Sequence, residues 1–186
     1  MSMDGELASS DELITDSRFA GPELVTVGAP EQDAGGAVVV VGVDGSQASL
    51  YALRQATTVV KAIGGRVAVV YARTMPTMAG DALSAADMGV LADAAEASAH
   101  AAERDALAVC GRAGVDASFI SCDGDPGRAI IDVAHEFDAS CVVVGATTHG
   151  PIASLFLSSV AQYLLHHCDI SLVIVRPQRA EAPVTT

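Results

Sequence analysis

The sequence predicts an α/β fold, a single doubly wound domain in which a five-stranded parallel sheet is sandwiched between helices. Short runs of β-branched residues alternate five times with longer segments of helical periodicity. Two of these runs, 38–41 and 142–144, contain only valine, as expected of strands that are buried on both faces of a parallel sheet. Hydrophobic residues make up 51% of the 186 residues, which is enough for one core.

Helical periodicity and glycine stops define the first half of the domain. Alanine, valine and isoleucine recur at helical spacing after Gln47, and Gly64-Gly65 ends that helix. An Ala-rich segment with the same periodicity predicts a longer helix that Gly114 ends. Order is expected to begin at Ala37, and the predicted elements of this half are the strands 38–43 and 66–72, the helices 47–63 and 85–113, and a mobile loop over 73–84.

The second half contains the run around which the chain is organised. Asp125 is expected to cap a helix that has Pro126 at its first position. The apolar run that begins at Cys141 is expected to be central, and Gly145 marks a tight turn where the chain leaves that strand. The other predicted elements are a more alternating strand 115–122 nearer an edge, a helix over about 158–167 and a last strand 171–175.

The first 36 residues differ from the rest of the chain. They are acidic, Arg18 is their only basic residue, and their apolar pairs Leu13-Ile14 and Leu24-Val25 lack sustained periodicity. We expect a flexible arm here, and a partner-binding motif is the alternative. The expected organisation is an arm over 1–36, a domain over 37–177 and a polar tail over 178–186.

The formal charge of -13 argues against nucleic acid or an anionic membrane as the partner. No segment approaches the roughly 18 uninterrupted apolar residues of a membrane span. The first 20 residues have no basic region of the kind that begins a signal peptide, so a cytoplasmic protein is expected. The four cysteines lack metal-site spacing and are expected to be reduced core residues: Cys110, Cys122, Cys141 and Cys168.

Landmarks along residues 37–177 together resemble the universal stress protein family. These are the Asp44-Gly45-Ser46 start, the Gly124-Asp125-Pro126 turn, the strand end at Gly145 and the ending from Ser159-Val160 to Arg176. The resemblance implies a sheet of five parallel strands in the order 3-2-1-4-5. It also implies a site for ATP or AMP with Mg²⁺ where strands one and four diverge, and a homodimer that forms through the last strand, 171–175.

The family's nucleotide-binding pattern is Gly-x2-Gly-x9-Gly-Ser/Thr. Gly145 and Ser159 match its first and last positions, but Thr148 and Ser158 stand where the pattern has glycine. Thr148 is β-branched and tolerates a positive φ poorly, and Ser158 either crowds a phosphate or caps the helix itself. The resemblance implies that Asp44 and Ala72 face the adenosine and that Val160 lies by the phosphates. The candidate nucleotide-binding residues are Gly42, Asp44, Ala72, Gly145, Thr148, Gly150, Ser158, Ser159 and Val160.

Positive charge is missing from the second half of the domain, since no Lys or Arg occurs from Ala129 to Val175. A triphosphate there would depend on amides, hydroxyls, His149 and a metal ion. His149 could be a phosphate donor or a general base, but a surface loop residue is the favoured interpretation. Asp44 is open to two interpretations, a ligand contact or a turn-and-cap residue. Pro151-Ile152 stand where a P-loop needs Lys-Ser/Thr, and the Gly-x-Ser-x-Gly motif of serine hydrolases is absent.

These observations favour a dimeric regulatory module of the stress response with weak or lost ATP binding. The alternative is a member of the same family that binds ATP or AMP and is at most a slow ATPase. A third hypothesis, an unrelated flavodoxin-like enzyme, lacks a reactive constellation in this sequence. No catalytic residue and no metal ligand is assigned.

Overall fold

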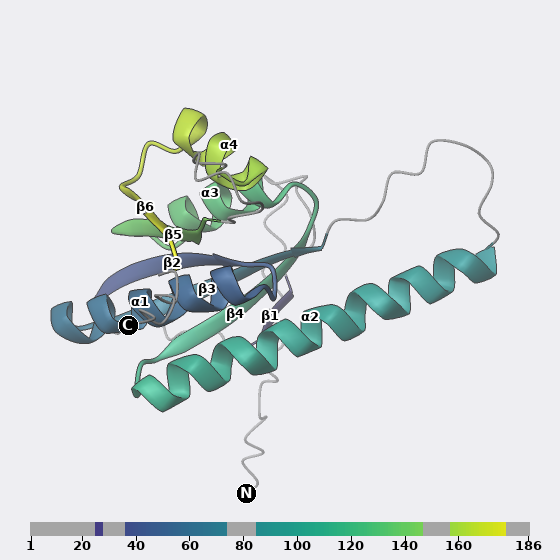
Figure 1. Ribbon diagram of the computed structural model, residues 1–186, viewed down its shortest axis with the longest axis horizontal. Coiled ribbons are helices and arrows are strands. Elements are labelled where there is room, and N and C mark those ends of the chain that lie inside the picture. The colour runs from purple at the N-terminus through teal and green to yellow at the C-terminus, as the bar shows by residue number, and fades with distance from the viewer. Residues whose placement is uncertain (1–24, 28–35, 74–84, 147–156, 178–186) are drawn as a thin grey trace, which may run out of the picture.

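A computed structural model describes residues 25–27, 36–73, 85–146 and 157–177. In this part of the chain six strands and four helices form one layered domain (Figure 1). In chain order the elements are β1 (Val25–Val27), β2 (Ala37–Val43), α1 (Gln47–Ile63), β3 (Gly65–Arg73), α2 (Ala85–Ala113), β4 (Ala117–Asp123), α3 (Pro126–Glu136), β5 (Cys141–Gly145), α4 (Ser159–His167) and β6 (Leu172–Val175).

The sheet has the strand order β1-β4-β3-β2-β5-β6. The five strands from β2 onward pair in parallel, and their order is the predicted 3-2-1-4-5. In the middle of the sheet Val41 lies opposite Val69 on β3 and Val143 on β5. The winding reverses between β2 and β5, so the carboxyl ends of these two strands flank the position at which such sheets bind ligands.

One strand was not predicted. Val25–Val27, within the segment expected to be a flexible arm, pairs antiparallel with β4 and adds a sixth strand to the sheet. Of the rest of that segment, residues 1–24 and 28–35 lie outside the described residues. A strand of three residues is too short to show periodicity, so the pattern of apolar residues could not predict it.

The core consists of two clusters, one on each face of the sheet, because successive side chains of a strand point to opposite faces. Val39 and Val41 pack with Leu53 against α1 and α2. Val38 and Val40 pack with residues of α3 and α4 on the other face. The valine runs therefore serve both clusters at once, as the doubly buried strands of a parallel sheet should.

Helix ends follow the predicted caps. The Asp125 side chain accepts a hydrogen bond from the amide of Arg128 at 2.9 Å, with Pro126 at the first position of α3. Gly64 and Gly114, which follow α1 and α2, have φ of 69° and 64°, a conformation that glycine adopts at low cost. Local sequence thus determines where these helices begin and end.

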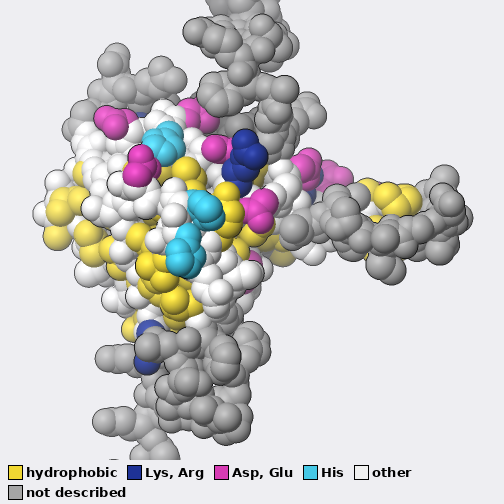
Figure 2. Space-filling view, turned by 90° about the horizontal axis from the view of Figure 1, so that it is seen from above, with side chains coloured by type: hydrophobic (Ala, Val, Ile, Leu, Met, Phe, Trp, Pro, Cys, Tyr) yellow, Lys and Arg dark blue, Asp and Glu magenta, His cyan; other side chains and the backbone are white. Residues whose placement is uncertain are grey.

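The surface above α3 and α4 carries histidine and acidic side chains (Figure 2). His135 of α3 lies 3.1 Å from Asp169, and the rings of Tyr163 and His167 are 4.3 Å apart. His166 and His167 occupy the last turn of α4, where a positive charge interacts favourably with the helix dipole.

We find no cluster of metal-binding side chains among the described residues. No helix in this part of the chain is long and apolar enough to span a membrane.

Candidate functional site

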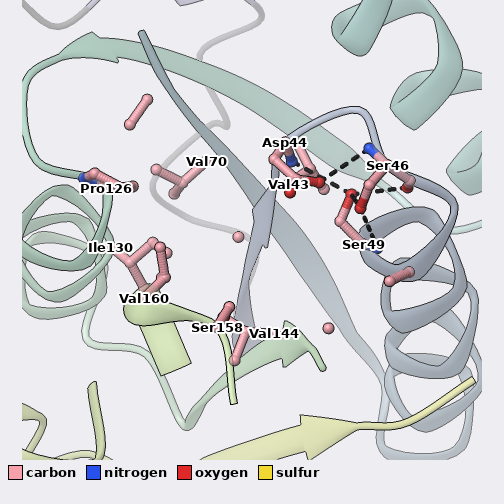
Figure 3. Close-up of a pocket in the computed structure, with 14 residues that line it drawn as sticks. Val43, Asp44, Ser46, Ser49, Val70, Pro126, Ile130, Val144, Ser158 and Val160 are labelled. Carbon is pink, nitrogen blue, oxygen red and sulfur yellow. Dashed lines mark hydrogen bonds between the residues drawn. The ribbon is translucent and has the colours of Figure 1, made fainter. Parts of the chain in front are cut away.

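A pocket opens at the carboxyl ends of β2 and β5, between the amino-terminal ends of α1, α3 and α4 (Figure 3). Its cavity volume is about 90 Å³, and it measures about 530 Å³ when the space open to solvent is included. It is lined by Gly42, Val43, Asp44, Ser46, Ala48, Ser49, Val70, Ala72, Pro126, Ile130, Val144, Gly145, Ser158 and Val160.

Most of the candidate residues named from sequence meet at this pocket. Ser159 is the first residue of α4 but is not among the residues that line the pocket. Thr148 and Gly150, like His149, lie outside the described residues. The six candidates that line the pocket are Gly42, Asp44, Ala72, Gly145, Ser158 and Val160.

Sequence reasoning missed other lining residues. Ser46 and Ser49 stand one turn apart at the start of α1, so the Asp44-Gly45-Ser46 motif was a usable signal for them. Pro126 and Ile130 come from the first turns of α3, which lies across the pocket from Asp44 (Figure 3). No motif marks Ile130, because only the packing of α3 against the sheet brings it here.

Asp44 is held by a hydrogen-bonded turn at the end of β2. Its Oδ1 accepts from the amide of Ser46 at 2.9 Å, and its own amide donates to Ser49 Oγ at 3.3 Å. Ser46 in turn caps α1, because its Oγ accepts from the amide of Ser49 at 3.2 Å. Asp44 therefore does act as a turn residue, and it lines the pocket as well.

This turn keeps Asp44 ionised. Burial raises the pKa of its carboxyl, but the hydrogen bonds with Ser46 and Ser49 outweigh burial and lower the pKa below its ordinary value of 3.8. An ionised carboxylate accepts hydrogen bonds and cannot donate them. At neutral pH this side of the pocket therefore attracts hydroxyl and amino groups and repels anions.

The amino-terminal end of α4 reaches the pocket through Ser158. The Ser158 hydroxyl accepts a hydrogen bond from the amide of Ala161 at 3.2 Å and so caps the helix. Helix amino-terminal ends bind anions because their first amides have no partner within the helix. Here one of these amides already has a partner from its own chain.

Gly145 has a different role from the one predicted. Its φ is not positive, so no tight turn requires a glycine at this position. A Cβ atom added to Gly145 would instead lie 2.7 Å from the carbonyl oxygen of Ala48. The glycine lets the backbone of α1 approach the end of β5, which brings the Asp44 turn and β5 together around the pocket.

The remaining walls are apolar, and positive charge is absent from the described lining. Val70, Ile130 and Val160 provide aliphatic surface, and among the described residues Asp44 is the one charged side chain that lines the pocket. Arg73, which follows the lining residue Ala72, forms two 2.9 Å hydrogen bonds with the carboxylate of Asp123. Such an arrangement suits a flat, largely apolar group with hydroxyls at one end better than a polyanion.

Comparisons of sequence point to one family. The model of the universal stress protein family matches residues 37–176. A universal stress protein from Synechocystis sp. is 43% identical over 53 residues, which are 28% of this chain and 34% of that protein. The chain thus matches about a third of the length of this curated relative.

Solved structures of universal stress proteins have the same fold as this chain. A universal stress protein in complex with cAMP is 27% identical, with a TM-score of 0.59 over 75% of this chain and 97% of that chain. A universal stress protein family protein from Arabidopsis thaliana with AMP bound is 15% identical, with a TM-score of 0.59 over 80% of this chain and 96% of that chain. The second likeness concerns the fold alone.

Proposed function

Since the chain belongs to the universal stress protein family, we propose that it is a cytoplasmic binding module that regulates a stress response. In this proposal the pocket between β2 and β5 takes the adenosine part of a nucleotide, and ATP binds weakly or not at all. A relative with 27% identity is known in complex with cAMP, and a structural neighbour has AMP bound. Both ligands carry one phosphate and one adenosine.

The adenosine end of the proposed ligand suits the chemistry of the pocket. The Asp44 carboxylate is an acceptor, and a ribose offers two adjacent hydroxyl donors. Ile130, Val70 and Val160 provide aliphatic surface against which a purine can be buried at roughly 25 cal/mol per Å² of apolar area. This division between one polar side and one apolar side is typical of sites for nucleosides.

The observation that best supports weak ATP binding is the hydrogen bond that the Ala161 amide donates to the Ser158 hydroxyl. A phosphate oxygen that bound the Ala161 amide would have to displace the Ser158 hydroxyl from it, so the amino-terminal end of α4 has one amide fewer to offer. No Lys or Arg lines the described pocket to compensate, and Asp44 adds repulsion. Each further phosphate on the ligand therefore adds little to its affinity, so the pocket favours ligands with few phosphates.

We further propose that the module acts as a homodimer through β6. This strand is the last of the described sheet, and Val173 is 46% exposed. The amide of Val142 donates to the Ser171 carbonyl and that of Ala146 to the Val175 carbonyl. Backbone groups alternate along a strand, so those of Ile174 point away from β5 and are available to a second copy.

The test is mass spectrometry of the purified protein after denaturation, which identifies any nucleotide carried through purification. We expect no ATP, and a trace of AMP or adenosine at most. The site itself is tested with the variant Asp44→Asn, which keeps the size of the side chain and removes its charge. If the pocket is the site, this variant should weaken adenosine binding measured by calorimetry, and unchanged affinity would refute the assignment.

A member that binds ATP or AMP more tightly, with slow or no hydrolysis, is the second candidate function. Gly145 and Ser159, which match the ends of the family pattern, favour it, as do the nucleotide complexes of the relatives. In this case Thr148 and Ser158 would be tolerated substitutes for glycine. ATP recovered in near-stoichiometric amount with the protein would favour this candidate over the first.

A further inference from the structure

β4 is the last of the five parallel strands on its side of the sheet, and its outer edge needs protection. An open edge presents unpaired amides and carbonyls that recruit strands from other molecules. Proteins usually block this with charged residues, proline or a bulge along the strand. From Ala117 to Cys122 β4 has no charged residue and no proline; Asp123 is its last residue, and Asp116 precedes its first.

In this chain the middle of that edge is covered by β1. Val25 lies opposite Ser121, Thr26 opposite Ile120 and Val27 opposite Phe119, in antiparallel register. Pro22 and Pro30 flank this short segment in the sequence, and proline cannot donate a hydrogen bond within a sheet. As described, β1 covers only the centre of β4, from Phe119 to Ser121.

We propose that the outer edge of β4 is a strand-docking site whose occupant is the chain's own segment Val25–Val27. The segment adds a strand to the sheet, the mode by which extended peptides bind exposed sheet edges. Its role is to keep the uncharged edge closed to strands of other molecules.

The connection to β2 permits occupation by the same chain. Nine residues, 28–36, separate β1 from β2. β2 lies three strands from β1, or roughly 15 Å at the usual strand spacing. Nine residues extend to about 30 Å, so the segment reaches its own β4 without strain.

The experiment replaces Val25 and Val27 with proline in the full-length chain. The matched control replaces Ile14 and Asp16, which have the same spacing in the preceding segment, with proline. Hydrogen exchange of the β4 amides is followed by mass spectrometry. The V25P/V27P variant should exchange the amides of Phe119 and Ser121 faster by roughly fivefold to tenfold, the protection of about one net hydrogen bond. The control should match the unmodified chain. Equal exchange in all three proteins would refute the pairing.

Light scattering distinguishes a docking site from a passive edge. The V25P/V27P variant should gain mass with concentration, and a synthetic peptide of residues 22–30 added in excess should reverse both this association and the faster exchange. Failure of the peptide to do either would show that the edge does not bind strands. If the variant instead loses mass relative to the unmodified chain, β1 is supplied by a second copy and the assignment to the same chain is wrong.

Discussion

Replacing Ser158 with glycine tests how this pocket treats phosphate. The Ser158 hydroxyl accepts from the Ala161 amide at 3.2 Å, so its removal leaves that amide for a phosphate oxygen. A charge-assisted hydrogen bond contributes about 1.5–3 kcal/mol, and the added freedom of glycine takes back about 0.5–1 kcal/mol. The net gain of about 0.5–2.5 kcal/mol corresponds to a roughly twofold to seventyfold higher affinity for ATP.

Calorimetry with ATP and Mg²⁺, and separately with adenosine, measures this effect. The affinity for adenosine should stay the same, because adenosine has no phosphate for the released amide. Ser158→Thr is the matched control: it keeps a hydroxyl that caps α4 and should leave ATP binding as in the unmodified chain. Adding Thr148→Gly to Ser158→Gly should raise ATP affinity further, as the family pattern implies. An ATP affinity that Ser158→Gly leaves unchanged, or an equal gain for adenosine, would refute the reasoning.

Three further predictions concern assembly, packing and pH. Ile174→Pro removes an outward backbone donor from β6 and should convert a dimer to monomers in light scattering; an unmodified chain that is already monomeric at micromolar concentration contradicts the dimer. Gly145→Ala forces a Cβ against the Ala48 carbonyl and should lower the free energy of unfolding by about 1–3 kcal/mol in urea titrations. Gly111→Ala, where a Cβ meets nothing within 4 Å, is its control and should not destabilise. Burial raises the pKa of Cys110 from 9.0 to about 11, so the folded state holds this proton more tightly than the unfolded chain. The contribution of this thiol to the free energy of unfolding is fully present below pH 9 and should fall by roughly 1.4 kcal/mol per pH unit as the pH rises toward 11. If the free energy of unfolding of Cys110→Ala falls with pH as steeply as that of the unmodified chain, this prediction is contradicted.

The parallel sheet was predictable because its signal is local and repeated. The valine runs of β2 and β5 are apolar at every position, which only a strand covered on both faces requires. Asp125 and Ser158 cap helices with their own side chains, so their role is set within four residues of sequence. The strand order came from the family resemblance.

What the sequence could not reveal depends on contacts between distant segments. β1 is held by backbone pairing, which leaves little trace in side-chain pattern. Ile130 reaches the pocket only because α3 packs across the end of the sheet. Gly145 looked like a turn glycine, but the backbone of α1 explains it, and nothing in its own neighbours along the sequence indicates that approach.

The central claim is that the pocket binds adenosine but gives additional phosphates little support. Titrating the unmodified chain with AMP and with ATP and Mg²⁺ in a calorimeter tests it most directly. The account predicts that ATP binds no more tightly than AMP, because Ser158 occupies the Ala161 amide and no cation lines the described pocket. An ATP affinity more than about tenfold above that of AMP, or about 1.4 kcal/mol, would contradict the account and establish the chain as an ATP-binding member of its family.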